Sequence, residues 1–255
     1  MNLEAKAREI RREILERALR IGKGHVASAL SWVEIAVALF YGTMKPGDRF
    51  VLSKVHGHLT LDAILADLTP AREGGFNTAG MLMWPGWPAV CSGSLGQGLG
   101  MAAGIALAHK IDGNPARVFC VLSDAELHEG AIWEAAMFAG HHKLRNLIAI
   151  VDNNRQSCAN FTSDVLNVNP IWQKFKAFGW DFDEYGEPHL RGHDAEYLVK
   201  RFKLRSDPPS DEHWPIAQIV HTIKGKGIPF MEGNPKFHHQ LPKGDEIEIA
   251  RRALA

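Results

Sequence analysis

Oxygen-bearing side chains follow two apolar runs near the middle of the sequence. Asp124 comes shortly after residues 118–122, and Asn154 comes shortly after residues 147–151. Both runs are short and apolar, which predicts buried parallel strands whose carboxyl ends lie at one edge of a sheet. A carboxylate, an amide oxygen and the backbone carbonyl of Gln156 are hard ligands that suit Mg²⁺, with water and phosphate oxygens completing its coordination. We therefore predict a metal and phosphate site at this edge.

The segment between the two runs predicts a helix that connects the strands. Ile132, Ala135, Ala136 and Ala139 recur at helical spacing, so the whole stretch forms a βαβ unit. A second interpretation of the polar residues remains open, in which Asp124 only caps the following helix and the neighbouring amides form a turn.

Further elements follow from the same periodicities. The fold class that they indicate is α/β, with three layers, a mainly parallel sheet and one domain over residues 1–255. We predict helices at residues 3–20, 31–40, 171–178 and 195–202, a small-residue helix that residues 92–100 open and that runs to Ala108, and strands at residues 50–54, 181–185 and 215–223. Residues 71–92 are rich in Gly, Pro and Trp and predict an irregular loop.

Composition excludes several classes of protein. The 29 Lys and Arg residues balance the 29 Asp and Glu residues among 255, which argues against a nucleic-acid partner. Three cysteines without a CxxC pattern argue against a disulfide framework and a zinc ribbon. The charged N-terminal helix has no apolar signal core, and no run is long enough to cross a membrane. We expect a soluble, cytoplasmic protein.

The central segment resembles a known family. D-x-E-x-x-E-G-x-x-W-E-A, followed by L-x-N-L-I-x-I-x-D-x-N, resembles the thiamin diphosphate motif of transketolases, with Asp124 and Asn154 thirty residues apart. The resemblance implies a thiamin diphosphate-binding fold and the cofactors thiamin diphosphate and Mg²⁺. It implies that Asp124, Asn154 and the Gln156 carbonyl hold the metal, and that Asp124 and Asn154 also contact the cofactor.

Two family glycines are replaced in this motif, at Ser123 and Ala125. The Ala125 N–H keeps its implied place against the diphosphate, but a positive φ there would cost about 1 kcal/mol. Glu129 matches the acidic residue that lies at the family's subunit interface and links paired active sites, and the resemblance therefore makes it a catalytic candidate.

Three further segments carry histidines that match the family. His25 follows a Gly-x-Gly pattern, and the resemblance implies that it contacts substrate and cofactor. His56 follows Ser-Lys-x and would approach the diphosphate. Of the pair His238-His239, His239 fits best the family histidine that contacts the diphosphate and the substrate. A zinc site at His56 and His58 is an alternative, but no third ligand follows at regular spacing.

A glycine-rich segment at residues 92–100 matches the family segment whose backbone lies against the aminopyrimidine, a role that we carry to Gly93 and Leu95. It lacks the last glycine of a dinucleotide fingerprint. The family's Gly-His-Pro segment is replaced by residues around Trp84 and Trp87, which either pack as apolar side chains or indicate a substrate other than ordinary sugar phosphates.

The resemblance stops where a complete transketolase continues into the pyrimidine-binding domain that supplies an activating glutamate. We therefore expect the N-terminal subunit of a split transketolase, in an α₂β₂ heterotetramer, transferring a two-carbon ketol unit from a ketose to an aldehyde. Two alternatives remain: the α subunit of a 2-oxo acid dehydrogenase, and a non-catalytic interaction subunit.

Overall fold

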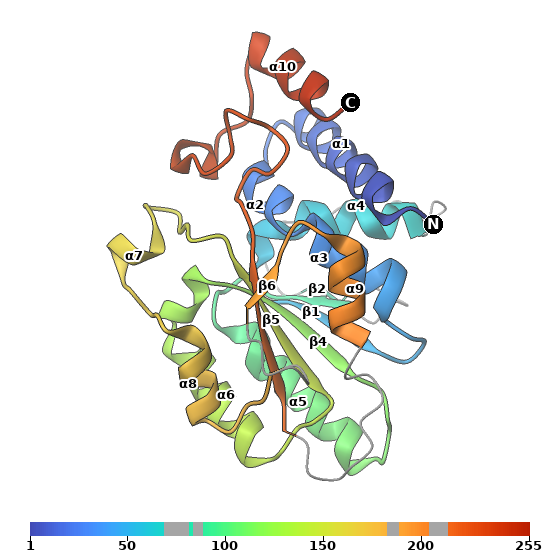
Figure 1. Cartoon of the computed structure of the whole chain (residues 1–255), viewed down its shortest axis with the longest axis vertical. Coiled ribbons are helices and arrows are strands. Elements are labelled where there is room, and N and C mark those ends of the chain that lie inside the picture. Colours follow the sequence, from blue (N-terminus) through green and yellow to red (C-terminus); the bar gives the residue numbers. More distant parts are fainter. Residues whose placement is uncertain (69–81, 84–88, 183–188, 204–213) are drawn as a thin grey trace.

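The computed structural model describes residues 1–68, 82–83, 89–182, 189–203 and 214–255. Its centre is a seven-stranded sheet with helices packed on both faces (Figure 1). The strands lie in the order β2-β3-β1-β4-β5-β7-β6, and all pairs are parallel except β2 with β3. Their bounds are β1 Arg49–Leu52, β2 Leu82–Met83, β3 Ala89–Cys91, β4 Val118–Ser123, β5 Leu147–Asn153, β6 His189–Arg191 and β7 Ile216–His221.

The described helices come before, between and after these strands. They are α1 Leu3–Ile21, α2 Val26–Ser31, α3 Val33–Ala38, α4 His58–Leu68, α5 Gln97–Ile111, α6 Gly130–His141, α7 Thr162–Val165, α8 Ile171–Ala177, α9 Ala195–Lys203 and α10 Asp245–Ala253. A π-helical turn at Leu39–Thr43 and 3₁₀ turns at Val55–Gly57, Ala125–His128 and Pro235–His238 join them. None of the helices in these segments is both long and apolar enough to cross a membrane.

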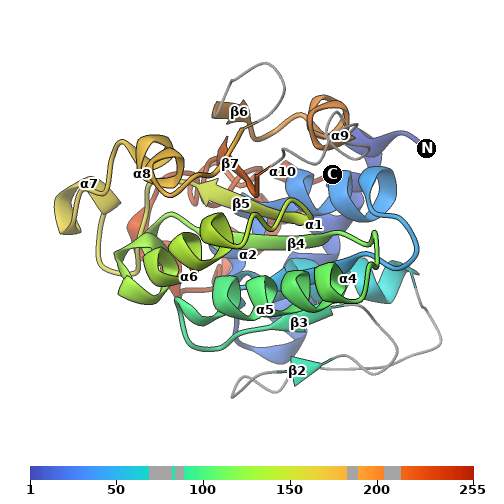
Figure 2. The same ribbon diagram turned by 90° about the horizontal axis from the view of Figure 1, so that it is seen from below.

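The alternation of strand side chains produces two separate cores. In β4, Phe119 and Val121 point into the core formed with α1, α3, α4 and α9, while Val118, Cys120 and Leu122 point into the core formed with α5, α6 and α8. Because both faces of β4 are buried, its sequence is apolar up to the last residue, Ser123. Figures 1 and 2 show these helix groups on opposite sides of the sheet, with α10 beside α1. The expected three-layer α/β/α fold is confirmed.

The structure corrects the helix predicted at residues 31–40. The helix begins earlier, at Val26, and is interrupted at Trp32, where φ and ψ are −116° and 19°. The buried Trp32 indole stacks on Phe50 with 6.1 Å between centroids and donates a hydrogen bond to the Gly57 carbonyl at 3.0 Å. These tertiary contacts outweigh the local helical preference.

Residues 71–92 are also not irregular throughout, because they contain β2 and β3. The parallel pairing of β3 with β1 gives the backbone of β1 a hydrogen-bonded neighbour, which the short Ala-Val-Cys run did not indicate. Trp84 and Trp87 lie outside the described residues. So does most of the strand predicted at residues 181–185, of which Asp181 forms one parallel bridge with Ile216.

Two glycines of α5 provide a matched test of how closely this helix packs against the end of β1. A Cβ at Gly98 would lie 2.7 Å from the Ser53 Cα, whereas a Cβ at Gly100 would meet nothing within 4 Å. We expect Gly98→Ala to lower the free energy of unfolding by about 1–3 kcal/mol, because backbone atoms must move apart. Gly100→Ala should raise it by about 0.5–1 kcal/mol. Denaturant unfolding measures both, and equal effects would contradict the close contact.

Candidate functional site

The chain changes direction in the sheet between β1 and β4. After β1 the chain forms β2 and β3 on one side, and from β4 it passes to β5 on the other. In open α/β sheets, ligands bind outside the carboxyl ends of the strands at such a switch point. Ser123 pairs in register with Asp152, and Asn153 pairs with His221, so three strands end together there.

Asp124 is buried directly after β4. Its carboxylate accepts hydrogen bonds from the N–H of Ala125 at 2.9 Å and of Arg155 at 2.6 Å. Burial raises the pKa of Asp124 to about 7, with the nearby Asp152 carboxylate acting in the same direction. The capping interpretation is therefore correct for the Ala125 contact, but it is incomplete because the second oxygen reaches the loop after β5.

The backbone at this loop carries strain at a position that the sequence did not indicate. Among the described residues with side chains, only Lys143 and Arg155 have a positive φ, and Arg155 at 63° is the one that donates to Asp124. Ala125 is not among them, so the penalty expected for replacing a glycine there does not arise.

Asn154 is oriented by a buried network around Asp152. The Asn154 amide nitrogen donates to Asp152 Oδ2 at 3.3 Å and to Ser31 Oγ at 3.0 Å. Its Oδ1 accepts from the Gln156 N–H at 3.1 Å. Asp152 also pairs with the buried Lys54. The network holds the Asn154 amide nitrogen toward Asp152. The Asn154 side-chain oxygen therefore faces the loop that contains Gln156.

Lys224, which follows β7, is buried rather than solvated. Its ammonium donates to the carbonyls of Ser157 at 3.1 Å and of Gln156 at 3.5 Å, and it contacts His238 Nδ1 at 2.7 Å. Burial lowers the pKa of Lys224 to about 8, and the Lys54 ammonium acts in the same direction. A buried cation therefore lies beside the carbonyl predicted to bind the metal.

Four histidines gather from three distant segments of the chain. The ring centroid of His25 lies 6.3 Å from that of His56, 5.2 Å from His238 and 4.7 Å from His239. The structure thus brings together the candidate residues His25, His56 and His239. It also adds His238, which is the buried member of its pair and the one that contacts Lys224, whereas His239 is exposed. The sequence contained both histidines but not their difference in burial.

The glycine-rich segment is attached to this edge by a buried carboxylate. Glu126 accepts hydrogen bonds from the Gly96 N–H at 2.7 Å and from the Ser53 hydroxyl. Gly93 and Leu95 lie just before this anchor. Glu129 is exposed at the start of α6, and a Cβ on Gly96 would lie only 2.8 Å from the Glu129 Cβ. The structure therefore places Glu129 beside the segment but on the outer surface.

These residues fit a divalent cation with a diphosphate. The described hydrogen bonds of Asp124 come from backbone N–H groups, so a buried carboxylate faces the loop without a directly bonded cation. The side-chain oxygen of Gln156 is buried without a partner among the described residues. A cavity of about 1270 Å³ reaches Asp124, Asn154, Gln156 and Lys224, although the four clustered histidines are not part of its lining. The oxygen ligands are of the kind that Mg²⁺ prefers.

Fold and site together define an α/β domain with a buried polar site at the switch point of its sheet. Residues 4–255 match the family described as transketolase, thiamine diphosphate binding domain, and the chain belongs to this family of transferases.

Two relatives match over nearly their whole lengths. An apulose-4-phosphate transketolase subunit of Actinobacillus succinogenes is 35% identical over 99% of this chain and 95% of its own length. The 6-deoxy-6-sulfo-D-fructose transketolase subunit SqwG of Clostridium sp. is 35% identical over 94% of this chain and 91% of its own length. The crystal structure of transketolase from Campylobacter jejuni superposes with a TM-score of 0.79 and 26% identity. It covers all of this chain, but the chain covers only 43% of that protein.

Proposed function

We propose that this chain is the diphosphate-binding subunit of a split transketolase. In this function it holds thiamin diphosphate and Mg²⁺, and with a separate pyrimidine-domain subunit it transfers a two-carbon ketol unit from a ketose to an aldehyde. The observation that carries the proposal is the hydrogen bond from the Arg155 N–H, in the loop after β5, to the Asp124 carboxylate. It lies at the carboxyl ends of the strands, at the switch point between β1 and β4. The match to transketolase subunits of nearly equal length supports it.

The oxygens of Asp124 and Asn154 and the carbonyl of Gln156 would hold the metal ion. Lys224 would contribute positive charge to the diphosphate, since its ammonium already lies at Gln156. The Ala125 N–H donates to the Asp124 carboxylate at 2.9 Å in this structure, and we propose that it turns to the same phosphate groups when the cofactor is bound. Gly93 and Leu95 would present backbone groups to the aminopyrimidine. When bound, the cofactor supplies the nucleophilic carbon and the electron sink that ketol transfer needs.

The histidines would handle protons and hydroxyl groups of the sugar. Burial lowers the pKa of His25 to about 4, with the nearby His239 acting in the same direction, so the His25 ring is neutral at physiological pH. Burial holds the pKa of His56 well below its usual value, with the Lys54 ammonium acting in the same direction. A neutral imidazole both donates and accepts a hydrogen bond, which suits a sugar hydroxyl. We propose His25 and His239 for the substrate and His56 for the diphosphate.

The partner and the substrate are proposed from the relatives. Both relatives are named as transketolase subunits, and the exposed Glu129 suits a contact between subunits, which supports the α₂β₂ assembly. Their names specify two different sugars, apulose 4-phosphate and 6-deoxy-6-sulfo-D-fructose. We propose that this chain likewise acts on a sugar other than the ordinary pentose phosphates. Highest rates with xylulose 5-phosphate and ribose 5-phosphate would contradict this.

Partner dependence gives the direct test of the function. Ketol transfer is measured with the purified chain, with a pyrimidine-domain subunit of a split transketolase, and with both together in Mg²⁺ and thiamin diphosphate. We expect turnover only in the mixture. Strong turnover by the chain alone would refute partner dependence. Activity on a 2-oxo acid with a lipoyl acceptor, and none on ketoses, would instead favour the dehydrogenase alternative.

A further inference from the structure

The loop that carries Lys224 is held at its backbone on both sides of that residue. Before Lys224, the Ile223 N–H donates a hydrogen bond to His193 Nε2 at 2.8 Å. After it, the Gly225 N–H donates to the Ala27 carbonyl of α2 at 2.9 Å. The Lys224 side chain starts between these two contacts, so they set the position from which its ammonium group reaches the proposed diphosphate site.

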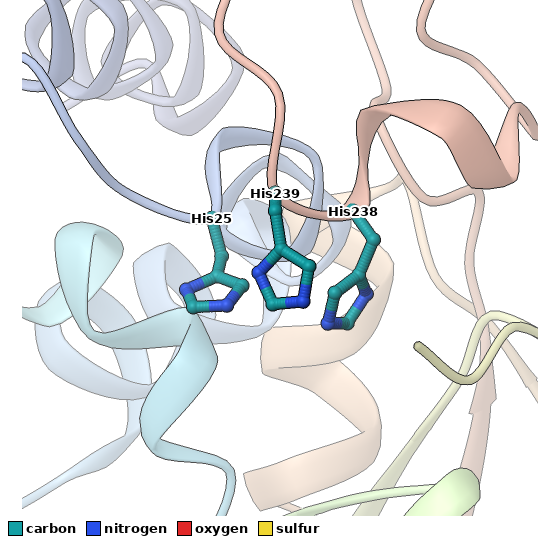
Figure 3. Close-up of side chains that lie close together, drawn as sticks. All are labelled: His25, His238 and His239. Carbon is teal, nitrogen blue, oxygen red and sulfur yellow. The ribbon is translucent and has the colours of Figure 1, made fainter. Parts of the chain in front are cut away.

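The ammonium group of Lys224 ends beside the clustered histidines. It contacts His238 Nδ1 at 2.7 Å, and Figure 3 shows the His238 ring next to those of His25 and His239. It also donates to the Ser157 carbonyl at 3.1 Å. Both contacts depend on the backbone at Lys224 staying where the loop holds it.

His193 connects this loop to a buried carboxylate of α3. Burial alone would raise the pKa of Glu34, but hydrogen bonds from His193 and Arg11 lower it to about 2, so Glu34 is ionised at physiological pH. An ionised carboxylate only accepts hydrogen bonds, and His193 Nδ1 lies 3.0 Å from Glu34 Oε2, so Nδ1 carries the proton. Nε2 is then the unprotonated nitrogen, which accepts from the Ile223 N–H.

Arg11 of α1 holds the carboxylate in turn. Its two Nη atoms donate to Glu34 at 2.6 and 2.8 Å, and its Nε donates to the Lys226 carbonyl at 3.1 Å. Both side chains of this ion pair are buried. A bidentate pair fixes orientation as well as distance. Arg11 and Glu34 therefore present a fixed acceptor to His193, and Arg11 also contacts the far end of the same loop.

The close approach of Gly192 to β7 brings His193 to this position. The Gly192 N–H donates to the His221 carbonyl at 2.8 Å, and a Cβ on Gly192 would lie only 2.2 Å from that carbonyl oxygen. A side chain at residue 192 would push the two segments apart. The absence of a Cβ at Gly192 thus lets the His193 ring reach both Glu34 and the Ile223 N–H.

We propose that His193 is a positioning residue for diphosphate binding, and that it acts by holding the backbone of the loop from which Lys224 extends. Glu34 and Arg11 act one step further away, because they fix the tautomer and the orientation of the His193 ring. His193 acts through Lys224 and not by touching the cofactor. This inference rests on the proposed function, since it requires that Lys224 meets a diphosphate.

A double-mutant cycle tests whether His193 acts through Lys224. The affinity for thiamin diphosphate in Mg²⁺ is measured by calorimetric titration of the wild type, His193→Ala, Lys224→Met and the double variant. We expect His193→Ala alone to weaken binding roughly 10-fold, the lower end of what loss of a supporting contact costs. In the Lys224→Met background the same change should weaken binding less than about 2-fold, because the residue that His193 positions is already absent.

Two further measurements separate positioning from general damage to the fold. The side chain of His193 is 18% exposed, so His193→Ala should stay folded by circular dichroism. In the cofactor-free chain, amide hydrogen exchange at Ile223 should be faster in His193→Ala than in the wild type. His193→Gln should restore slow exchange and most of the affinity, because one amide offers an N–H to Glu34 and an oxygen to the Ile223 N–H.

The outcomes distinguish this inference from the proposed function. Equal losses of affinity in the two backgrounds would overturn the positioning role and leave the diphosphate site intact. Unchanged exchange at Ile223 in His193→Ala, or a His193→Gln variant as weak as His193→Ala, would also overturn it. If the wild-type chain bound no thiamin diphosphate, either alone or with a pyrimidine-domain subunit, the proposed function itself would fail, and the inference with it.

Discussion

Asp124→Ala is expected to weaken the binding of thiamin diphosphate in Mg²⁺ by at least about 100-fold and to remove ketol transfer in the presence of the partner. The reason is that Asp124 is the charged member of the proposed metal ligands. Mutating a residue that only supports a metal ligand typically lowers metal affinity roughly 10- to 100-fold, and loss of the ligand itself should lower it more. Calorimetric titration measures the affinity. Asp164→Ala, which removes an exposed carboxylate on α7, is the control and should bind normally. Equal affinities in the two variants would contradict the assignment.

The same carboxylate gives the chain a distinct pH dependence of stability. The folded pKa of Asp124 is raised to about 7, above its usual value of 3.8. Between these values the folded state keeps a proton that the unfolded state has lost, so this contribution to stability falls as the pH rises and is lost above about pH 7.

We therefore expect the melting temperature of the cofactor-free chain to fall more between about pH 5 and about pH 8 in the wild type than in Asp124→Ala. Mg²⁺ with thiamin diphosphate should reverse the fall in the wild type, because the bound cation favours the ionised carboxylate. Parallel pH profiles of the two proteins, measured by differential scanning calorimetry, would contradict the raised pKa.

Lys224→Met is expected to lower the affinity for thiamin diphosphate by roughly 10- to 100-fold, because a charge-assisted hydrogen bond to an anion contributes about 1.5–3 kcal/mol. Methionine keeps most of the apolar stem of the side chain, so the variant should remain folded. Because the pKa of Lys224 is about 8 in the free chain, wild-type affinity should also decline as the pH rises above about 8. This decline should be absent in the variant.

Lys226→Met provides the matched control for this prediction. Lys226 is two residues away, but it is only partly buried and pairs with Glu232 at 3.3 Å. Calorimetric titration of both variants should therefore show a loss of affinity for Lys224→Met alone. If Lys226→Met lost as much affinity, a general effect of positive charge would replace the specific role of Lys224.

The sequence determined the central βαβ unit and the polar residues at its strand ends. Both strands are buried on two faces, so apolar runs predict them, and Asp124 and Asn154 follow because the positions after a parallel strand lie at the ligand-binding edge. The match of the motif predicted the family, which the comparisons confirm. These features depend on local patterns, which is why one chain sufficed to predict them.

Only the tertiary structure decided how distant segments meet. Lys224, His238 and the loop after Asn154 are far apart in sequence, and their burial depends on how β7 lies beside β5 and how the Pro235–His238 turn returns to α2. The interruption of the helix at Trp32 likewise depends on Phe50 and Gly57. Burial and long-range contacts are properties of the packed chain. They raise the pKa of Asp124, and they bury His238 while leaving its neighbour His239 exposed.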